Sequence, residues 1–313
     1  MANTPVVVLD DTLTNIANAI RGKNGSSDKY KPGQMAGAID NIPAGGIGIP
    51  REVSNGVYQA PEVTSFSLPS NATDVGQRAL AYAFDSSPNL TSVDFSTLTT
   101  VSGERALYNA FHYCRKVTSV DLSSLTTVSG VHSLNGAFDG CTSLTSVDLS
   151  SLTTVSGHQA FANTFRDCSN ITSVDLSSLT TASGKSALYY VFSGCTALTS
   201  VNLSSLTTVS NGAFTYAFNN CKNITSVDFS SLTTIGGGQP MFCAFYGCSK
   251  LTSLSFPALT VDSFGSVVDQ FDKMLSGVTG CTVHFPAAIQ AKVETMTGYP
   301  NFGGTNTTVL FDL

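Results

Sequence analysis

Hydrophobic residues recur at fixed positions along most of the chain. A phrase of alternating apolar and polar residues, rich in Ser and Thr, returns at spacings of 27, 27, 27, 27, 27, 26 and 27 residues; its eight copies begin at Val63, Leu90, Val117, Leu144, Ile171, Leu198, Ile224 and Leu251. A Ser- and Thr-rich segment can be a disordered low-complexity tract, but disordered tracts do not keep register in this way. The pattern therefore predicts a repeat protein.

Each unit is predicted to contain a short β-strand, a turn and a helix. In the copy from Leu90, Val93 and Phe95 alternate with polar residues, which is the period of a strand with one wet face. A Ser-Gly pair, Ser102 and Gly103, predicts the turn, because Gly accepts backbone angles that other residues avoid. The apolar positions that follow form one stripe over two helical turns; they are Ala106, Leu107, Ala110, Phe111 and Cys114.

Single units bury too little apolar surface to fold alone, so they are expected to stack. The expected fold is an α/β repeat solenoid with a parallel sheet on one side and helices on the other, plus a small N-terminal helical module. The predicted divisions are an N-terminal docking or oligomerisation module at 1–44, a linker and cap at 45–62, repeats at 63–279 and a C-terminal cap at 280–313. Within this last cap, 287–296 is expected to be a helix and "TTVLFDL" a final strand.

The repeat motif resembles the leucine-rich repeats of the BspA-like type, known from bacterial surface proteins. The motif is L-x-x-V-x-L followed by A-F-x-x-C-x-x-L; one copy carries Ala137, Phe138, Cys141 and Leu144. The resemblance covers about residues 60–285 and implies a leucine-rich repeat fold. One departure is visible, since the proline that usually follows the strand remains at Pro69, Pro257 and Pro286 and is Ser elsewhere.

The N-terminal segment has a different pattern. Apolar residues at helical spacing predict two short helices with little buried area, the first with Leu13, Ile16, Ala17 and Ile20 and the second with Met35, Ile39 and Ile42. The stretch "LTNIANAIRGKNGSSDKYKPGQMAGAIDNI" resembles the N-terminal module of tail-associated structural proteins from phages and prophages of Gram-positive gut bacteria. That resemblance implies docking to other virion proteins through residues 1–44, with a homo-oligomer, for example a trimer, as a further expectation.

Composition narrows the range of partners. The 313 residues carry 15 Lys and Arg and a formal net charge of −6, which predicts no basic stripe and argues against nucleic acid and anionic membranes as partners. No apolar run approaches the roughly 20 residues that cross a bilayer. The start "MANTPVVVLDD" has no basic region and a short apolar run, which is not typical of a secretory signal.

The cysteines and histidines do not predict a metal site, a cofactor or an enzyme. Six cysteines share one repeat position and are expected to be small buried free thiols rather than disulfides, whereas Cys243 and Cys281 lie off this column; the six are Cys114, Cys141, Cys168, Cys195, Cys221 and Cys248. No C-x-x-C pair suggests zinc. The four histidines fall at unrelated repeat positions, so no catalytic constellation is expected.

A column of acidic residues is predicted along the wet face of the sheet. It contains Asp94, Asp121, Asp148, Asp175 and Asp228, with Asn202 interrupting. These carboxylates could bind cations or a sugar chain, or they could keep a flat sheet from associating. The second interpretation is preferred, because one Asp per rung offers too few oxygens for calcium.

Variation between copies concentrates on the side opposite the sheet. One column there reads Ala81, Tyr108, Asn135, Ala162, Tyr189, Thr215 and Phe242, and the next reads Tyr82, Asn109, Gly136, Asn163, Tyr190, Tyr216 and Cys243. Tyr and Asn are common on adaptable contact surfaces, so Tyr108, Tyr189, Tyr190 and Tyr216 are the candidate partner-binding residues. These positions could instead be free to drift. A repetitive glycan would suit the uniform sheet face, where Asp121, Asp148 and Asp175 are the candidates.

The expected function is that of a non-enzymatic, tail-associated phage or prophage protein. Its N-terminal module would dock to the virion, and its repeats would contact a bacterial surface protein or glycan. It would be synthesised in the host cytoplasm and end in the virion. The alternatives are a BspA-like adhesin on the bacterial surface and a spacer without a ligand.

Overall fold

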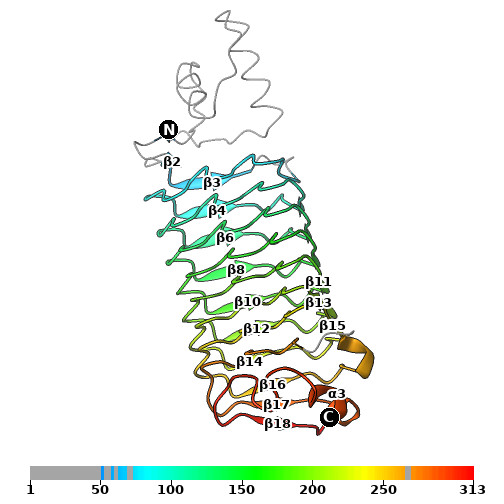
Figure 1. Ribbon diagram of the computed structural model, residues 1–313. Coiled ribbons are helices and arrows are strands. Elements are labelled where there is room, and N and C mark those ends of the chain that lie inside the picture. The colour runs from blue at the N-terminus through cyan, green and yellow to red at the C-terminus, as the bar shows by residue number, and fades with distance from the viewer. Residues whose placement is uncertain (1–50, 53–57, 60–62, 69–72, 265–268) are drawn as a thin grey trace, which may run out of the picture.

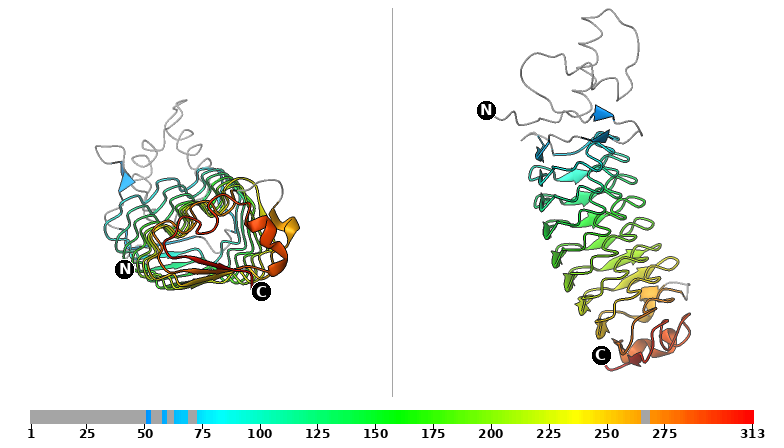
Figure 2. Two further views of the ribbon diagram at one scale, coloured as in Figure 1. Left: turned by 60° about the horizontal axis from the view of Figure 1, so that its bottom comes forward. Right: turned by 90° about the vertical axis from the view of Figure 1, so that its left-hand side faces the viewer.

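The structure is a computed structural model that describes residues 51–52, 58–59, 63–68, 73–264 and 269–313. The helices predicted within 1–44 and the proline at position 69 lie outside these residues. The described chain is a solenoid whose turns stack along one axis, with strands in register from one end to the other (Figure 1). Seen obliquely from the C-terminal end, successive turns follow one another around a common interior (Figure 2, left).

The parallel sheet predicted from the strand pattern is confirmed. It has seven strands; they are β3 (Ser65–Ser67), β4 (Ser92–Asp94), β6 (Ser119–Asp121), β8 (Ser146–Asp148), β10 (Ser173–Asp175), β12 (Ser200–Asn202) and β14 (Ser226–Val227). Equivalent residues pair between turns, so that Val93 lies opposite Val120 and Asp94 opposite Asp121. Toward the C-terminus a three-stranded parallel sheet follows, formed by β16 (Ser253–Ser255), β17 (Thr282–His284) and β18 (Thr308–Leu310).

A second parallel sheet, which the sequence pattern did not predict, runs beside the first. Its six strands are β5 (Thr100–Val101), β7 (Thr127–Val128), β9 (Thr154–Val155), β11 (Thr181–Ala182), β13 (Thr208–Ser210) and β15 (Thr234–Gly236). The apolar residues that precede and occupy these strands, such as Leu98 and Val101, are three positions apart rather than two, so no strand period is visible in this part of the repeat. The Thr that precedes each strand adds a hydrogen bond between turns; for example, the Thr126 hydroxyl donates to the Thr99 carbonyl at 2.9 Å.

The helix predicted for the second half of each unit is wrong. In its place is a ribbon of turns, which we call the turn ribbon; in one repeat it spans residues 103–114. Alternate N–H groups stay within the turn, as from Ala110 to the Leu107 carbonyl, and the others reach the next turn, as from Phe111 to the Ala137 carbonyl at 2.8 Å. The buried positions i, i+1, i+4, i+5 and i+8 have a period of four, and nine residues are too few to distinguish four from 3.6.

The Ser-Gly pair also has a different role from the one predicted. Gly103, Gly130, Gly157 and Gly184 have no left-handed backbone, so unusual backbone angles do not explain them. A Cβ at Gly103 would lie 2.5 Å from the carbonyl carbon of Gly76 in the preceding turn. Glycine is therefore needed because two backbones approach each other closely at this corner.

The interior is filled by columns of identical side chains. Neighbouring rings of the central column stack at 5.2–5.9 Å between centroids; the rings belong to Phe84, Phe111, Phe138, Phe165, Phe192, Phe218 and Phe245. The prediction of buried free thiols is confirmed, because all eight cysteines are free and buried. Each thiol of the six-membered column donates to a phenylalanine carbonyl of the preceding turn, as Cys114 does to Phe84 at 2.9 Å. Burial raises the pKa of the Cys114 thiol to about 12.

The C-terminal cap contains the expected strand and a shorter helix than expected. Strand β18 pairs with β17 in parallel. The helical part consists of the 3-10 turn η2 (Ala287–Ile289) and the single turn α3 (Gln290–Val293), and it ends before the predicted limit at Met296. The remaining elements are the antiparallel pair β1 (Arg51–Glu52) and β2 (Tyr58–Gln59) and the 3-10 turn η1 (Val261–Phe264). None of the helices described is long and apolar enough to span a bilayer.

Candidate binding surfaces

The aspartate column of the sheet face closes turns. The Asp121 carboxylate accepts the backbone N–H of Ser123 at 3.0 Å and its hydroxyl at 2.6 Å, and Asp148 accepts the same two groups of Ser150. Asp175 accepts the N–H of the serine two residues later, at 2.9 Å. A single acceptor oxygen is enough for this turn, so an amide can replace the carboxylate. This explains the asparagine at position 202, whose oxygen accepts the equivalent N–H at 3.1 Å.

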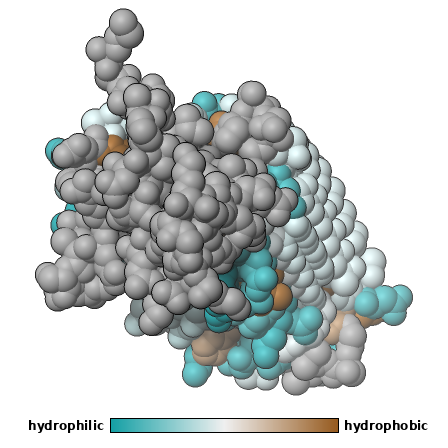
Figure 3. Space-filling view, turned by 90° about the horizontal axis from the view of Figure 1, so that it is seen from above, coloured by the Kyte–Doolittle hydropathy of each residue, from teal (hydrophilic) through white to brown (hydrophobic). Residues whose placement is uncertain are grey.

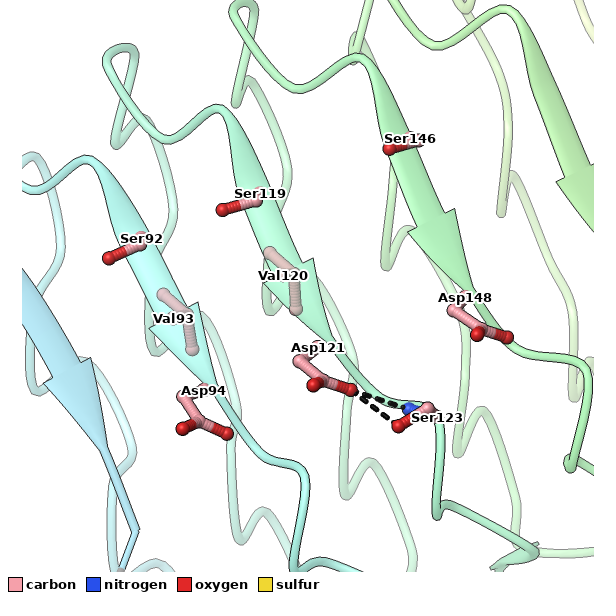
Figure 4. A pocket seen from close by; sticks show the side chains of 9 residues that line it. All are labelled: Ser92, Val93, Asp94, Ser119, Val120, Asp121, Ser123, Ser146 and Asp148. Carbon is pink, nitrogen blue, oxygen red and sulfur yellow. Dashed lines mark hydrogen bonds between the residues drawn. The ribbon is translucent and has the colours of Figure 1, made fainter.

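These side chains border a shallow hollow on the sheet. It is lined by Ser92, Val93, Asp94, Ser119, Val120, Asp121, Ser123, Ser146 and Asp148 (Figure 4). The pKa of Asp148 is lowered by the hydrogen bonds from the hydroxyl and the backbone of Ser150, which favour the charged form. Among the described residues, no three His, Cys, Asp or Glu side chains gather closely enough to hold a metal ion. The hollow is therefore a polar and negatively charged surface with repeating chemistry.

Three of the four candidate tyrosines come together on the turn ribbons. Tyr190 and Tyr216 stack at 4.7 Å between ring centroids, and Tyr189 meets Tyr190 edge to face at 4.4 Å. Phe242 extends the row, at 5.7 Å from Tyr216. We call these four residues the aromatic shelf. All four are partly exposed, and the Lys273 ammonium lies 5.6 Å from the centroid of the Phe242 ring.

Two hydroxyl groups of the shelf are held by neighbouring side chains. A hydrogen bond with the Cys243 thiol, followed by burial, raises the pKa of Tyr216 to about 12. Burial, and then the adjacent Tyr189, raise the pKa of Tyr190 to about 12. Tyr190 and Tyr216 are therefore uncharged at neutral pH.

The fourth candidate lies apart from the shelf. Tyr108 contacts Tyr82 at 5.4 Å and His132 at 6.4 Å between ring centroids. The turns between this group and the shelf carry smaller side chains in the same columns; they are Asn135, Gly136, Ala162 and Asn163. The tyrosines thus form two clusters on one face rather than a single site.

Backbone geometry explains part of the variation that suggested binding. Every residue of the second variable column has a left-handed backbone, from Tyr82 at φ 58° to Cys243 at φ 50°. Gly and Asn adopt this conformation most readily, which accounts for Asn109, Gly136 and Asn163. The rings at positions 190 and 216 are not explained in this way, since a bulky residue there costs about 1 to 2 kcal/mol.

A ladder of charged residues beside the shelf is not apparent from the sequence pattern. His112 lies 3.1 Å from Asp85 and 3.9 Å from Asp139, and Arg166 lies 3.3 Å from Asp139 and 3.5 Å from Asp167. Asp139 is buried, and burial raises its pKa to about 6 against the opposing effects of Arg166 and His112. The four histidines occupy unrelated repeat positions, so a comparison of histidines alone does not reveal this ladder. The sequence does show that His112 lies 27 residues from Asp85 and 27 residues from Asp139, which predicts that the three side chains are neighbours.

Sequence comparison identifies the repeat family. The sequence model of the BspA type leucine rich repeat region, which contains six copies, matches residues 51–164, 108–216 and 162–268, more than half of the chain. The chain belongs to the BspA-type leucine-rich repeat family. No curated protein matches it.

Solved structures similar to this BspA-type chain are also leucine-rich repeat proteins. One, from Bacteroides ovatus, is 19% identical, with 84% of this chain and 74% of that chain covered and a TM-score of 0.37. Another, from T. pallidum, is 21% identical, with 64% and 85% covered and a TM-score of 0.40. A third, from Eubacterium ventriosum, is 14% identical, with 79% and 73% covered and a TM-score of 0.27.

The departure of this BspA-type chain from the usual proline now has a physical reason. Repeats with Asp or Asn at the end of the strand have Ser two residues later, and the N–H of that Ser closes the turn. Proline has no N–H to donate. Accordingly, Pro257 and Pro286 follow strands that end in Ser255 and His284, where no carboxylate needs the bond.

Proposed function

We propose that this BspA-type chain is a non-enzymatic binding protein that contacts its partner through the aromatic shelf. The observation that carries the proposal is the meeting of Tyr189, Tyr190 and Tyr216 on one face, two of them at left-handed positions where other turns place Asn or Gly. Tyrosine supplies a large amphipathic contact area at a low cost in side-chain entropy. A tyrosine with a backbone cost that is offset only by contacts with other shelf residues suggests a role in recognition.

The sheet face is the weaker candidate for a specific contact. Its outward residues repeat from turn to turn, and the carboxylates of Asp121 and Asp148 already hold their own turns. A periodic glycan remains the ligand that would suit such a surface, with Asp121, Asp148 and Asp175 along its path. The outward serines of the seven-stranded sheet, such as Ser146, and the tyrosines of the aromatic shelf can be substituted independently. The contribution of each face to binding can therefore be measured separately.

For the biological setting we propose a phage or prophage tail. The support is the sequence resemblance of the N-terminal segment alone, and residues 1–44 would dock the repeats to other virion proteins, as a trimer or another homo-oligomer. A cell-surface adhesin is the second candidate, favoured by the membership of the BspA-type family. Tail, baseplate or lysis genes beside the coding sequence would support the first setting, and a secretion-linked locus would support the second. Light scattering of the full chain tests the trimer through its mass.

The binding proposal is tested by a variant that borrows residues from neighbouring turns. Tyr189→Ala, Tyr190→Asn and Tyr216→Asn place at each site a residue type that other turns have in the same column, as at Ala162, Asn109 and Asn163. In whole-cell and glycan-array assays, we expect this triple variant to lose about tenfold or more in affinity. The control is Tyr246→Ala, which removes an exposed ribbon tyrosine outside the shelf.

Two results would count against the proposal. Unchanged binding by the triple variant would remove the shelf as the contact site. Absence of binding by the parent chain to every cell and glycan tested would instead favour the spacer, which has no ligand.

A further inference from the structure

Five consecutive turns each present one basic or titratable side chain where the turn ribbon begins. These residues form what we call the cationic ridge; Arg78, Arg105 and His132 share one repeat column, and His158 and Lys185 lie in the column one residue earlier. Backbone bonds of 2.9 Å hold the turns in register along it, including those from Arg105 to Val131 and from His132 to His158. The net charge of −6 predicts no basic stripe; the alignment of repeats nevertheless groups these five side chains at one edge.

Side chains of neighbouring turns contact one another along the ridge, but these contacts do not neutralise its positive charge. The carboxylate of Glu104 lies 3.7 Å from Arg78 and 3.9 Å from Arg105, and all three side chains are more than two-fifths exposed. Such exposed pairs are weak, so their charges remain available. The Arg105 guanidinium lies 5.9 Å from the centroid of the Tyr108 ring, and the rings of His132 and His158 meet at 5.1 Å.

We propose that the cationic ridge binds a linear polyanion, namely a surface polymer with phosphate or carboxylate groups recurring along an extended polyol or sugar chain. Adjacent turns are about 4.8 Å apart, so these five side chains extend over about 19 Å, in a row that shifts by one residue between His132 and His158. A small anion needs donors that converge on one point, whereas these side chains lie in a row. The proposal extends the proposed surface-binding function but does not use the aromatic shelf.

The backbone of the ridge disfavours an acidic peptide as the ligand. The N–H groups of Arg78, Arg105 and His132 all donate to the next turn, so they cannot pair with an incoming peptide strand. A polyol or sugar chain needs no such pairing. A DNA duplex carries about one negative charge per 1.7 Å of its axis, so the negative charge of the whole chain opposes it more strongly at long range than it opposes a polymer with more widely spaced charges.

Protonation of His132 would add positive charge to the row. Burial, and then the positive charges of His158 and Arg105, lower the pKa of His132, while Glu104 opposes this effect. His158 also faces the backbone carbonyl of Lys185, with its Nδ1 at 3.1 Å from that oxygen. We therefore expect polymer binding to strengthen when His132 is protonated at low pH.

The test measures binding of a fluorescently labelled poly(glycerol phosphate) to the full chain by anisotropy. Arg105→Gln with Lys185→Gln is expected to weaken binding about tenfold or more. The matched control is Lys222→Gln with Lys250→Gln, which removes the same charge from exposed positions outside the ridge and is expected to change affinity less than about twofold. Replacing His132 with Asn should abolish the strengthening at low pH.

Equal losses in the ridge variant and in its charge-matched control would overturn the proposal. So would binding of poly-glutamate or of a DNA duplex as tightly as the polyol phosphate, or failure of the parent to bind the polymer. The two proposals fail in different ways. If the aromatic shelf is not the contact site, the triple tyrosine variant binds cells normally while the ridge variant still shows weaker binding of the polymer. Thermal melts of every variant check that folding is unchanged.

Discussion

The sheet face and the turn ribbons are made from the same repeat but follow opposite rules. On the sheet, the outward residues are nearly identical from turn to turn, and one flank of the solenoid shows regular rows of intermediate hydropathy (Figure 3). Many of these residues serve the turns themselves, as the Asp148 carboxylate does for Ser150. On the ribbons, outward residues vary, and charged and aromatic clusters form between turns. Outward residues that are the same in every turn are therefore explained by the structure of the repeat, and outward residues that differ between turns are the candidates for contact with a partner.

The largest effect is expected where the two regions meet, at the glycine corner. Gly130→Ala places a Cβ against backbone atoms of Ser102 and Gly103, neither of which can yield without moving a turn. We expect a loss of about 3 kcal/mol in the free energy of unfolding, measured by urea denaturation. The control is Gly238→Ala, where a Cβ meets nothing within 4 Å. Equal stability of the two variants would contradict the close approach.

The two regions should respond to pH with opposite signs. The pKa of buried Asp139 is raised to about 6 in the folded state, so the folded chain holds a proton that the unfolded chain releases. Its stabilising contribution is therefore present below about pH 4 and is lost as pH rises to about 6, by about 3 kcal/mol. Asp139→Asn should remove this slope in urea titrations between pH 4 and 7.

Asp148 on the sheet provides the comparison. Its pKa is lowered in the folded state, so its contribution is present above the unfolded value and is lost as pH falls through the folded value. Because this side chain is exposed, the effect is smaller. If the loss of stability between pH 4 and 7 persisted in Asp139→Asn and disappeared in Asp148→Asn, Asp148 rather than Asp139 would be its source.

The aspartate column should tolerate an amide but not an apolar residue. Asp148→Asn retains an acceptor for the Ser150 N–H, as Asn202 does for its own turn. Asp148→Ala leaves that N–H without its partner and should cost about 1 kcal/mol in thermal or urea unfolding. If Asn and Ala were equally destabilising, the charge rather than the turn would explain the column.

The smallest effect on stability is expected at the shelf. Tyr190→Asn relieves a left-handed tyrosine but loses ring contacts with Tyr189 and Tyr216, each worth about 0.5 to 1.5 kcal/mol. These terms nearly cancel, so the melting temperature should barely change. A large drop in melting temperature would mean that the ring is retained for packing.

The repeat register, the parallel sheet and the buried thiols were predictable because each leaves a regular column in the sequence. The turn ribbon was not, since the stripe from Ala106 to Cys114 fits periods of 3.6 and four equally well. A signal did exist in the column directly before the cysteines, where Gly140, Gly194, Asn220 and Gly247 are residues that favour the left-handed backbone they adopt.

The candidate site was predictable in part. Tyr189, Tyr190 and Tyr216 are neighbours because the repeat period places them so, but their ring contacts depend on the ribbon geometry. The grouping of Asp139 with His112 and Arg166 required comparison of different residue types in one column. The role of the Asp column followed from bonds to Ser two residues later, which spacing alone does not specify.

The central claim is that the ribbons carry recognition while the sheet serves the fold. The most direct measurement compares cell binding by the parent, by the triple shelf variant and by a sheet variant with Ser146→Ala and Asp148→Asn. The account predicts that the shelf variant loses about tenfold or more in affinity while the sheet variant binds like the parent. Loss of binding by the sheet variant, with the shelf variant unaffected, would contradict it.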